Sequence, residues 1–123
     1  MTKILVAEDE KDIRELIAFT LRFAGYDVVL ANNGAEALER VSQEKPALVL
    51  LDVRMPKMTG YEVCRRLKEN PETEKIPVVF LSAKGQDREV QEGYESGAVD
   101  YIIKPFVPDE LIAQVKRILE QAG

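Results

Sequence analysis

The run Ala47-Leu48-Val49-Leu50-Leu51-Asp52, at residues 47–52, bears most strongly on the fold. Its apolar residues are unbroken and end in a carboxylate, a pattern typical of a β-strand that is covered on both faces. Strands covered on both faces occur in parallel sheets with helices packed on either side. The run therefore predicts the centre of a parallel α/β sheet, with Asp52 at the carboxyl end of its strand.

Four further segments are predicted to be strands because they are short, apolar and rich in β-branched residues. They are residues 3–8, 27–31, 77–82 and 99–104. The first and third of these are nearly continuous apolar runs, as in buried strands. The second and fourth carry Asp27 and Asp100, so we expect them at the edges of the sheet.

Segments with helical spacing separate the strands. The clearest begins near Ile13 and ends at Gly25, and Asn33 and Thr59 begin the next two, each with a glutamate three residues later as in a capping box. The fourth, about 86–95, is the weakest because a glycine interrupts it. The fifth begins near Pro108, which suits a first helical turn.

Strict alternation of strand and helix predicts parallel strands joined by right-handed crossovers. The order 2-1-3-4-5 places the three apolar strands in the middle of the sheet. We therefore expect an α/β fold with a doubly wound, five-stranded parallel sheet and helices on both faces. Residues 1–123 are predicted to form a single domain.

Composition excludes several kinds of chemistry. The 123 residues include one cysteine and no histidine, so histidine-based triads, imidazole bases and His-ligated zinc are excluded, as is an internal disulfide. The 17 basic and 22 acidic residues give a net charge of −5, which argues against nucleic-acid binding through this domain. Apolar runs are too short to cross a membrane, and no signal peptide is evident, so we expect a cytoplasmic protein.

The predicted strand ends gather chemically useful side chains. In an open α/β sheet, ligands bind beyond the carboxyl ends of the strands, beside the point where the strand order reverses. Glu8, Asp9 and Asp52 end the two strands at that point. Close carboxylates repel one another unless a cation lies between them, and oxygen ligands without histidine or cysteine select a hard ion such as Mg²⁺.

Lys104 and Ser82 end the two remaining strands on this side and add a positive charge and a hydroxyl. A metal pocket, a nucleophilic carboxylate, a lysine and a hydroxyl are what is needed to move and hold a phosphoryl group. The chain has neither a P-loop motif nor a Gly-x-Gly-x-x-Gly motif, and its first strand-to-helix turn is acidic.

Five motifs in order resemble the receiver (response regulator) domain of two-component signalling, of the CheY-like kind. They are Glu8-Asp9, Asp52, Met55-Pro56 followed by Gly60, Ser82-Ala83 and Lys104-Pro105-Phe106. The resemblance extends from end to end of the chain and implies the flavodoxin-like (βα)5 fold. It also implies a phosphoacceptor switch with only weak self-catalysed phosphorylation and dephosphorylation, not an enzyme.

The resemblance implies that Asp52 receives a phosphoryl group from a histidine kinase or a histidine phosphotransfer protein. It assigns a Mg²⁺ or Mn²⁺ ion to Asp9, Asp52 and the backbone carbonyl of Arg54, with Glu8 acting through water. Ser82 and Lys104 would contact the phosphoryl oxygens. The peptide before Pro105 would be cis.

Tyr101 matches the aromatic residue that turns inward when the hydroxyl residue moves. The output surface would comprise the fourth helix, the fifth strand and the fifth helix, acting on a downstream protein or on an output domain outside this chain. A phosphorylation-dependent homodimer through that surface is left open. Val99 and Gln114 stand where dimerising members commonly carry an acid and an arginine.

Other interpretations compete with this one. An aspartyl-nucleophile phosphatase also uses an aspartate at a strand end, but it normally needs a second acid two residues later, where this chain has Arg54. A flavodoxin-type cofactor module would carry Ser, Thr and Gly in the first loop, not three acids. A purely structural interaction domain would bind neither Mg²⁺ nor phosphoryl analogues. Ser82 alone could be a helix cap, and Tyr101 an ordinary strand aromatic.

Overall fold

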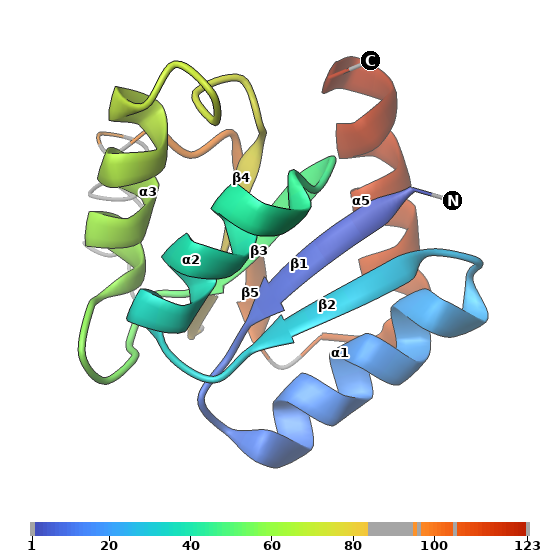
Figure 1. Ribbon diagram of the computed structural model, residues 1–123. Helices are drawn as coiled ribbons and strands as arrows, with labels where there is room; N and C mark the ends of the chain where they lie inside the picture. The colour runs from blue at the N-terminus through green and yellow to red at the C-terminus, as the bar shows by residue number, and fades with distance from the viewer. Residues whose placement is uncertain (1, 84–94, 96, 105, 123) are drawn as a thin grey trace.

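A computed structural model of the chain describes residues 2–83, 95, 97–104 and 106–122 (Figure 1). The strands are β1 (Lys3–Ala7), β2 (Asp27–Ala31), β3 (Leu48–Asp52), β4 (Val78–Ala83) and β5 (Asp100–Lys104). The helices are α1 (Lys11–Phe23), α2 (Gly34–Glu44), α3 (Gly60–Glu69) and α5 (Pro108–Ala122). The predicted helix at about 86–95 falls almost entirely outside the described residues.

All strand pairs are parallel, and the sheet order is β2-β1-β3-β4-β5. The predicted order is therefore confirmed, with the two strands that carry Asp27 and Asp100 at the edges. β1 and β3 are neighbours although a helix, a strand and a second helix separate them in the chain. The sheet reverses its direction of growth between them, which places a crevice at their carboxyl ends.

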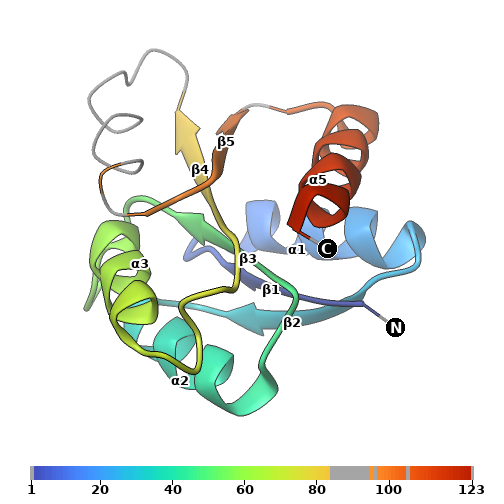
Figure 2. The ribbon, with the colours of Figure 1, turned by 90° about the horizontal axis from the view of Figure 1, so that it is seen from above.

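Helices cover both faces of the sheet, as Figure 2 shows: α1 and α5 lie on one side, and α2 and α3 on the other. Alternate residues of each strand point to opposite faces. In β3, Leu48 and Leu50 pack in the cluster that includes residues of α1 and α5, while Val49 and Leu51 pack in the cluster on the side of α2 and α3. This double burial explains the unbroken apolar run in β3.

The predicted helix starts are confirmed by their caps. The Asn33 side chain accepts a hydrogen bond from the backbone N–H of Glu36 at 2.9 Å, and the Thr59 side chain accepts one from that of Glu62 at 3.3 Å. Each cap satisfies a backbone N–H that has no partner within its helix. α1 ends just before Gly25, whose φ of 98° is the left-handed backbone that glycine adopts readily.

None of the helices in the described part of the chain is long and apolar enough to span a membrane.

Candidate functional site

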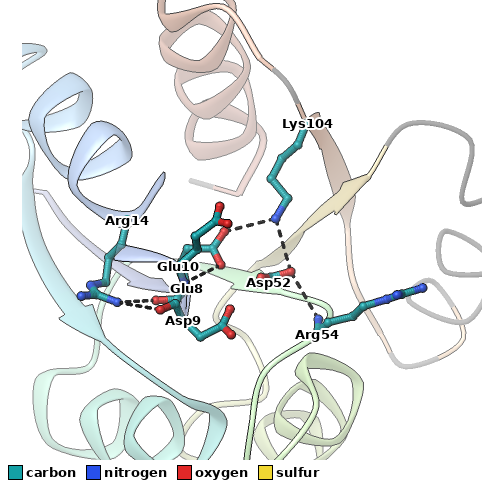
Figure 3. A network of polar contacts seen from close by, with 7 residues as sticks. All are labelled: Glu8, Asp9, Glu10, Arg14, Asp52, Arg54 and Lys104. Atoms are coloured by element: carbon teal, nitrogen blue, oxygen red, sulfur yellow. Dashed lines mark hydrogen bonds and ion pairs between the residues drawn. The ribbon is translucent and has the colours of Figure 1, made fainter. Parts of the chain in front are cut away.

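Neighbouring strands bring the predicted acids together at the carboxyl edge of the sheet. In the β1–β3 register, Ala7 lies opposite Leu51, so the next residues, Glu8 and Asp52, emerge at the same level. Lys104 ends β5 and extends its side chain back toward them (Figure 3). The parallel arrangement thus places side chains from three strands in one small volume.

Lys104 contacts both buried acids. Its Nζ donates a hydrogen bond to Glu8 Oε1 at 3.2 Å and lies 3.6 Å from Asp52 Oδ1 (Figure 3). Glu8 is completely buried and Asp52 is 7% exposed. Asp9, beside them, is exposed. The site therefore has buried ionisable groups at its base, and the exposed Asp9 lies on its solvent side.

Burial changes the pKa values of the ionisable groups at the bottom of the site. The loss of water around Glu8, followed by its hydrogen bond and charge repulsion with Asp52, raises the pKa of the Glu8 carboxyl to about 8. Burial alone would lower the pKa of Lys104, but the carboxylates of Asp52 and Glu8 outweigh burial and raise it above its usual value. Lys104 is therefore charged at neutral pH, and the site holds more negative charge than one lysine neutralises whenever Glu8 is ionised.

Glu8, Asp9 and Asp52, termed here the acidic cluster, are spaced to hold a cation. Each offers a carboxylate oxygen, and these oxygens all lie within 4.8 Å of one another. A donor set made only of oxygen fits Mg²⁺ or Mn²⁺ and does not fit a site built for zinc or copper. The three predicted acidic ligands thus lie together, and the chemistry of their donors fits the predicted ion.

The backbone after Asp52 contacts the carboxylate of that residue. The N–H of Arg54 donates to Asp52 Oδ1 at 3.3 Å, while the Arg54 side chain is exposed and extends away from the cluster (Figure 3). Farther along, the N–H of Met58 donates to the carbonyl of Pro56 at 2.8 Å around Lys57, whose φ is 70°. This tight three-residue turn is of a rare and strained kind.

Gly60, the first residue of α3, lies directly against the end of β3. A Cβ atom at this position would lie 2.4 Å from the backbone oxygen of Asp52 and 3.0 Å from the ring of Phe80. The N–H of Gly60 also donates to the carbonyl of Val53 at 3.0 Å. The glycine in the predicted motif is thus explained by the close approach of α3 to the residue before the loop.

Two other predicted residues lie on the neighbouring strands. Ser82, in β4, is 1% exposed, and the β3–β4 register pairs Asp52 with the residue just before it, Leu81. The ring of Tyr101, in β5, is buried and packs against Phe80 with 5.7 Å between ring centroids. Tyr101 therefore occupies an inward position. Pro105 lies outside the described residues.

Arg14 is not among the predicted site residues, but the structure places it at this site. Its guanidinium donates to the backbone carbonyl of Glu8 at 2.9 Å and to that of Asp9 at 3.4 Å (Figure 3). An arginine in the first turns of a helix is most often a solvent-facing charge. No local pattern in the sequence distinguishes one that reaches back to a preceding strand.

Comparison with known families gives a match over most of the chain. Residues 4–116 match the family model of the response regulator receiver domain. The chain belongs to this family. The predicted resemblance is therefore confirmed, and the acidic cluster lies where the motifs of a receiver domain were identified in the sequence.

Several curated relatives of this receiver domain are transcriptional regulators. The phosphate regulon transcriptional regulatory protein PhoB of Pseudomonas aeruginosa is 44% identical over 120 residues, which are 98% of this chain and 52% of that protein. The alkaline phosphatase synthesis transcriptional regulatory protein PhoP of Bacillus subtilis is 43% identical over 98% of this chain and 49% of its own length. The chain spans about half the length of these relatives.

Solved structures match the whole receiver fold. A putative response regulator from Chloroflexus aurantiacus has a TM-score of 0.93 and 37% identity, covering 97% of this chain and 98% of that one. The chemotaxis protein CheY4 of Vibrio cholerae has a TM-score of 0.90 and 32% identity, covering 96% of this chain and 98% of its own. Both structures match over nearly their full length, so this fold is that of a receiver domain.

Proposed function

We propose that this receiver is a phosphoacceptor switch in which Asp52 takes a phosphoryl group from a phosphohistidine on a partner kinase or phosphotransfer protein. The single observation that carries the proposal is the position of the Asp52 carboxylate. It lies in the acidic cluster, 3.6 Å from the ammonium group of Lys104, at the carboxyl end of β3. Because the chain has the receiver fold, an aspartate at this position is expected to accept a phosphoryl group.

The acidic cluster is proposed to hold Mg²⁺ or Mn²⁺. Asp9 and Asp52 would contribute carboxylate oxygens and Arg54 its backbone carbonyl, while Glu8, which already accepts from Lys104, would act through water. The bound ion supplies positive charge to the phosphoryl oxygens. A bound cation would also offset the repulsion among the three carboxylates, which explains why they can lie so close together.

The transfer itself needs little covalent work from the protein. A carboxylate oxygen of Asp52 attacks phosphorus opposite the donor nitrogen, so that a P–O bond forms as the P–N bond breaks. The electron pair of the P–N bond returns to the donor imidazole, which takes a proton from water. Lys104 stabilises the phosphoryl oxygens because its ammonium group already lies beside Asp52.

Phosphorylated Asp52 carries new negative charge and new acceptor oxygens. We propose that Ser82 donates its hydroxyl to one of these oxygens and that Lys104 shifts from Glu8 to another. The Tyr101 ring already packs inward against Phe80, so we expect phosphorylation to stabilise this position of the ring. The output surface would be β5 and α5 together with the helix predicted at about 86–95, which lies outside the described residues.

The proposed role is a switch with slow self-catalysis and not that of a phosphatase. Hydrolysis of the acyl phosphate by water restores Asp52 and releases phosphate. An aspartyl phosphatase normally places a second acid two residues after its nucleophile, and here that residue is Arg54, with its side chain directed away (Figure 3). The geometry therefore offers no acid at that position to protonate a leaving group.

An apolar groove beside the site suits the phosphodonor protein. The groove, about 310 Å³, is lined by Ile13, Leu16, Phe106 and Lys104. Since Lys104 lines the groove and also contacts Glu8 and Asp52, a helix of the donor that docks there would bring its phosphohistidine close to Asp52. We propose a DNA-binding output domain or a downstream protein as the next partner, because relatives of this receiver are transcriptional regulators and one of them is a DNA-binding regulator.

Incubation with acetyl phosphate and Mg²⁺, followed by intact mass measurement, tests the proposal. The wild-type receiver should gain the mass of one phosphoryl group, and Asp52→Asn should gain none. Asp27→Asn, which removes an acid from the opposite end of an edge strand, is the control and should label like the wild type. Labelling of Asp52→Asn would overturn the assignment of the acceptor, and rapid repeated turnover of phosphomonoesters would favour the phosphatase.

A further inference from the structure

Arg14, in α1, binds three consecutive carbonyls of the acidic turn between β1 and α1. Its guanidinium donates to the carbonyl of Glu8 at 2.9 Å and to that of Asp9 at 3.4 Å. Its backbone N–H donates to the carbonyl of Glu10 at 2.9 Å. Figure 3 shows the side chain reaching back from the helix to the turn that carries two members of the acidic cluster.

The start of α1 differs from the starts of α2 and α3. Asn33 and Thr59 cap those two helices with their side chains, whereas Glu10, at the corresponding position of α1, makes no side-chain cap. The turn before α1 therefore lacks the contact that fixes the other two turns. Arg14 provides a different restraint, since a charged guanidinium forms stronger hydrogen bonds with carbonyls than a neutral donor does.

We infer that Arg14 is a positioning residue for the metal site. The inference rests on the proposed function, because it concerns the ion held by the acidic cluster. Holding the carbonyls of Glu8 and Asp9 fixes the backbone from which their carboxylates extend. Asp9 gains most from this restraint, since it is exposed, whereas Glu8 is also held by Lys104. Groups that orient metal ligands from outside raise metal affinity through such contacts.

The sign of the effect separates positioning from simple electrostatics. A positive charge near a cation site repels the cation, so if charge dominated, removal of Arg14 would tighten Mg²⁺ binding. If positioning dominates, its removal weakens binding even though the local charge becomes more favourable to a cation. The two mechanisms therefore predict opposite changes for one substitution.

The test is a Mg²⁺ titration of the complete chain, followed by amide shifts in NMR spectra, with no phosphodonor present. Arg14→Gln should weaken Mg²⁺ affinity about tenfold, in the range found for outer contacts of metal ligands. Arg14→Lys keeps the charge but loses the two-carbonyl geometry, so it should fall between Arg14→Gln and the wild type. The free energy of unfolding is measured for each variant in EDTA.

Arg22→Gln is the matched control. Arg22 is also in α1, and its guanidinium also donates to a backbone carbonyl, that of Val28 at 3.2 Å, away from the acidic cluster. It should lose a similar amount of stability without changing Mg²⁺ affinity. Equal Mg²⁺ affinity in Arg14→Gln and the wild type, or tighter binding in Arg14→Gln, would overturn the inference. If the wild type itself binds no Mg²⁺, the proposed function fails first.

Discussion

The interior of the sheet and its carboxyl edge both contain fully buried side chains, but these side chains are chemically opposite. Leu50 and Glu8 both have 0% exposure. Leu50 packs in an apolar cluster, where loss of contact with water is favourable. Glu8 shares its surroundings with Asp52 and Lys104, where loss of water raises the pKa of its carboxyl to about 8. Burial of apolar side chains in the interior thus stabilises the fold. Burial of the ionisable side chains at the edge is unfavourable for stability and serves the functional site.

The largest effect is expected in the interior. Leu50→Ala should lower the free energy of unfolding by about 2–5 kcal/mol, because it removes buried methyl groups and leaves a cavity in a rigid sheet. Urea denaturation measures the loss. Leu16→Ala, at a position 46% exposed on α1, is the control and should cost about 0.5 kcal/mol. Similar losses of stability in the two variants would show that burial of Leu50 in the sheet interior does not contribute more to stability than an exposed leucine does.

A smaller effect is expected where the interior meets the edge. Gly60→Ala places a Cβ atom 2.4 Å from the backbone oxygen of Asp52, so α3 or the end of β3 must move. The expected loss of stability is about 1–3 kcal/mol, as for other overpacked sites. Affinity for beryllofluoride with Mg²⁺ should fall in the same variant, because Asp52 is displaced. Unchanged stability together with unchanged affinity would show that α3 is not in close contact with β3 in solution.

The smallest effect, and one of opposite sign, is expected at the edge. Because the pKa of Glu8 is raised from 4.5 to about 8, the folded protein in EDTA keeps a proton that the unfolded chain releases in this range. Its contribution to stability is complete below pH 4.5 and is lost as the pH rises to about 8. Glu8→Gln cannot lose that proton, so it should become more stable than the wild type, by about 1 kcal/mol, near pH 8.

Thermal or urea unfolding of both proteins between pH 5 and 8 measures this difference. The two stability curves should lie close together at the acid end and diverge as the pH rises. Parallel curves would mean that Glu8 titrates normally in the folded state. In contrast to the gain in stability, Glu8→Gln should bind Mg²⁺ more weakly, since the acidic cluster loses one carboxylate.

Most of the fold follows from local patterns. The apolar run predicted as the strand 47–52 is β3 at Leu48–Asp52, and the segment predicted at 99–104 is β5 at Asp100–Lys104. Hydrophobic pattern identifies a strand, but the hydrogen bonds to its neighbours determine its first and last residues. Asn33 and Thr59 were identifiable as caps because capping is a contact between residues three apart.

Contacts over long sequence distances could be predicted only in part. The sequence places Glu8, Asp52 and Lys104 at one edge because parallel strands share their direction. It does not show that Lys104 lies closer to Glu8, at 3.2 Å, than to Asp52, at 3.6 Å. Nor does it identify Arg14, whose contacts depend on the angle at which α1 leaves the sheet. Such angles come from packing of whole elements and leave no local pattern.

The ion pair between Glu8 and Lys104 joins residues that are 96 apart in the chain. During synthesis the N-terminal strands emerge first, and β5 pairs with β4 only after all four other strands have been made. Until then a nascent chain has both buried acids but lacks the lysine that lies between them. If Asp52 is the phosphoacceptor, as proposed, an unfinished chain lacks the lysine that stabilises the phosphoryl oxygens, so we expect efficient phosphorylation only once β5 is in place.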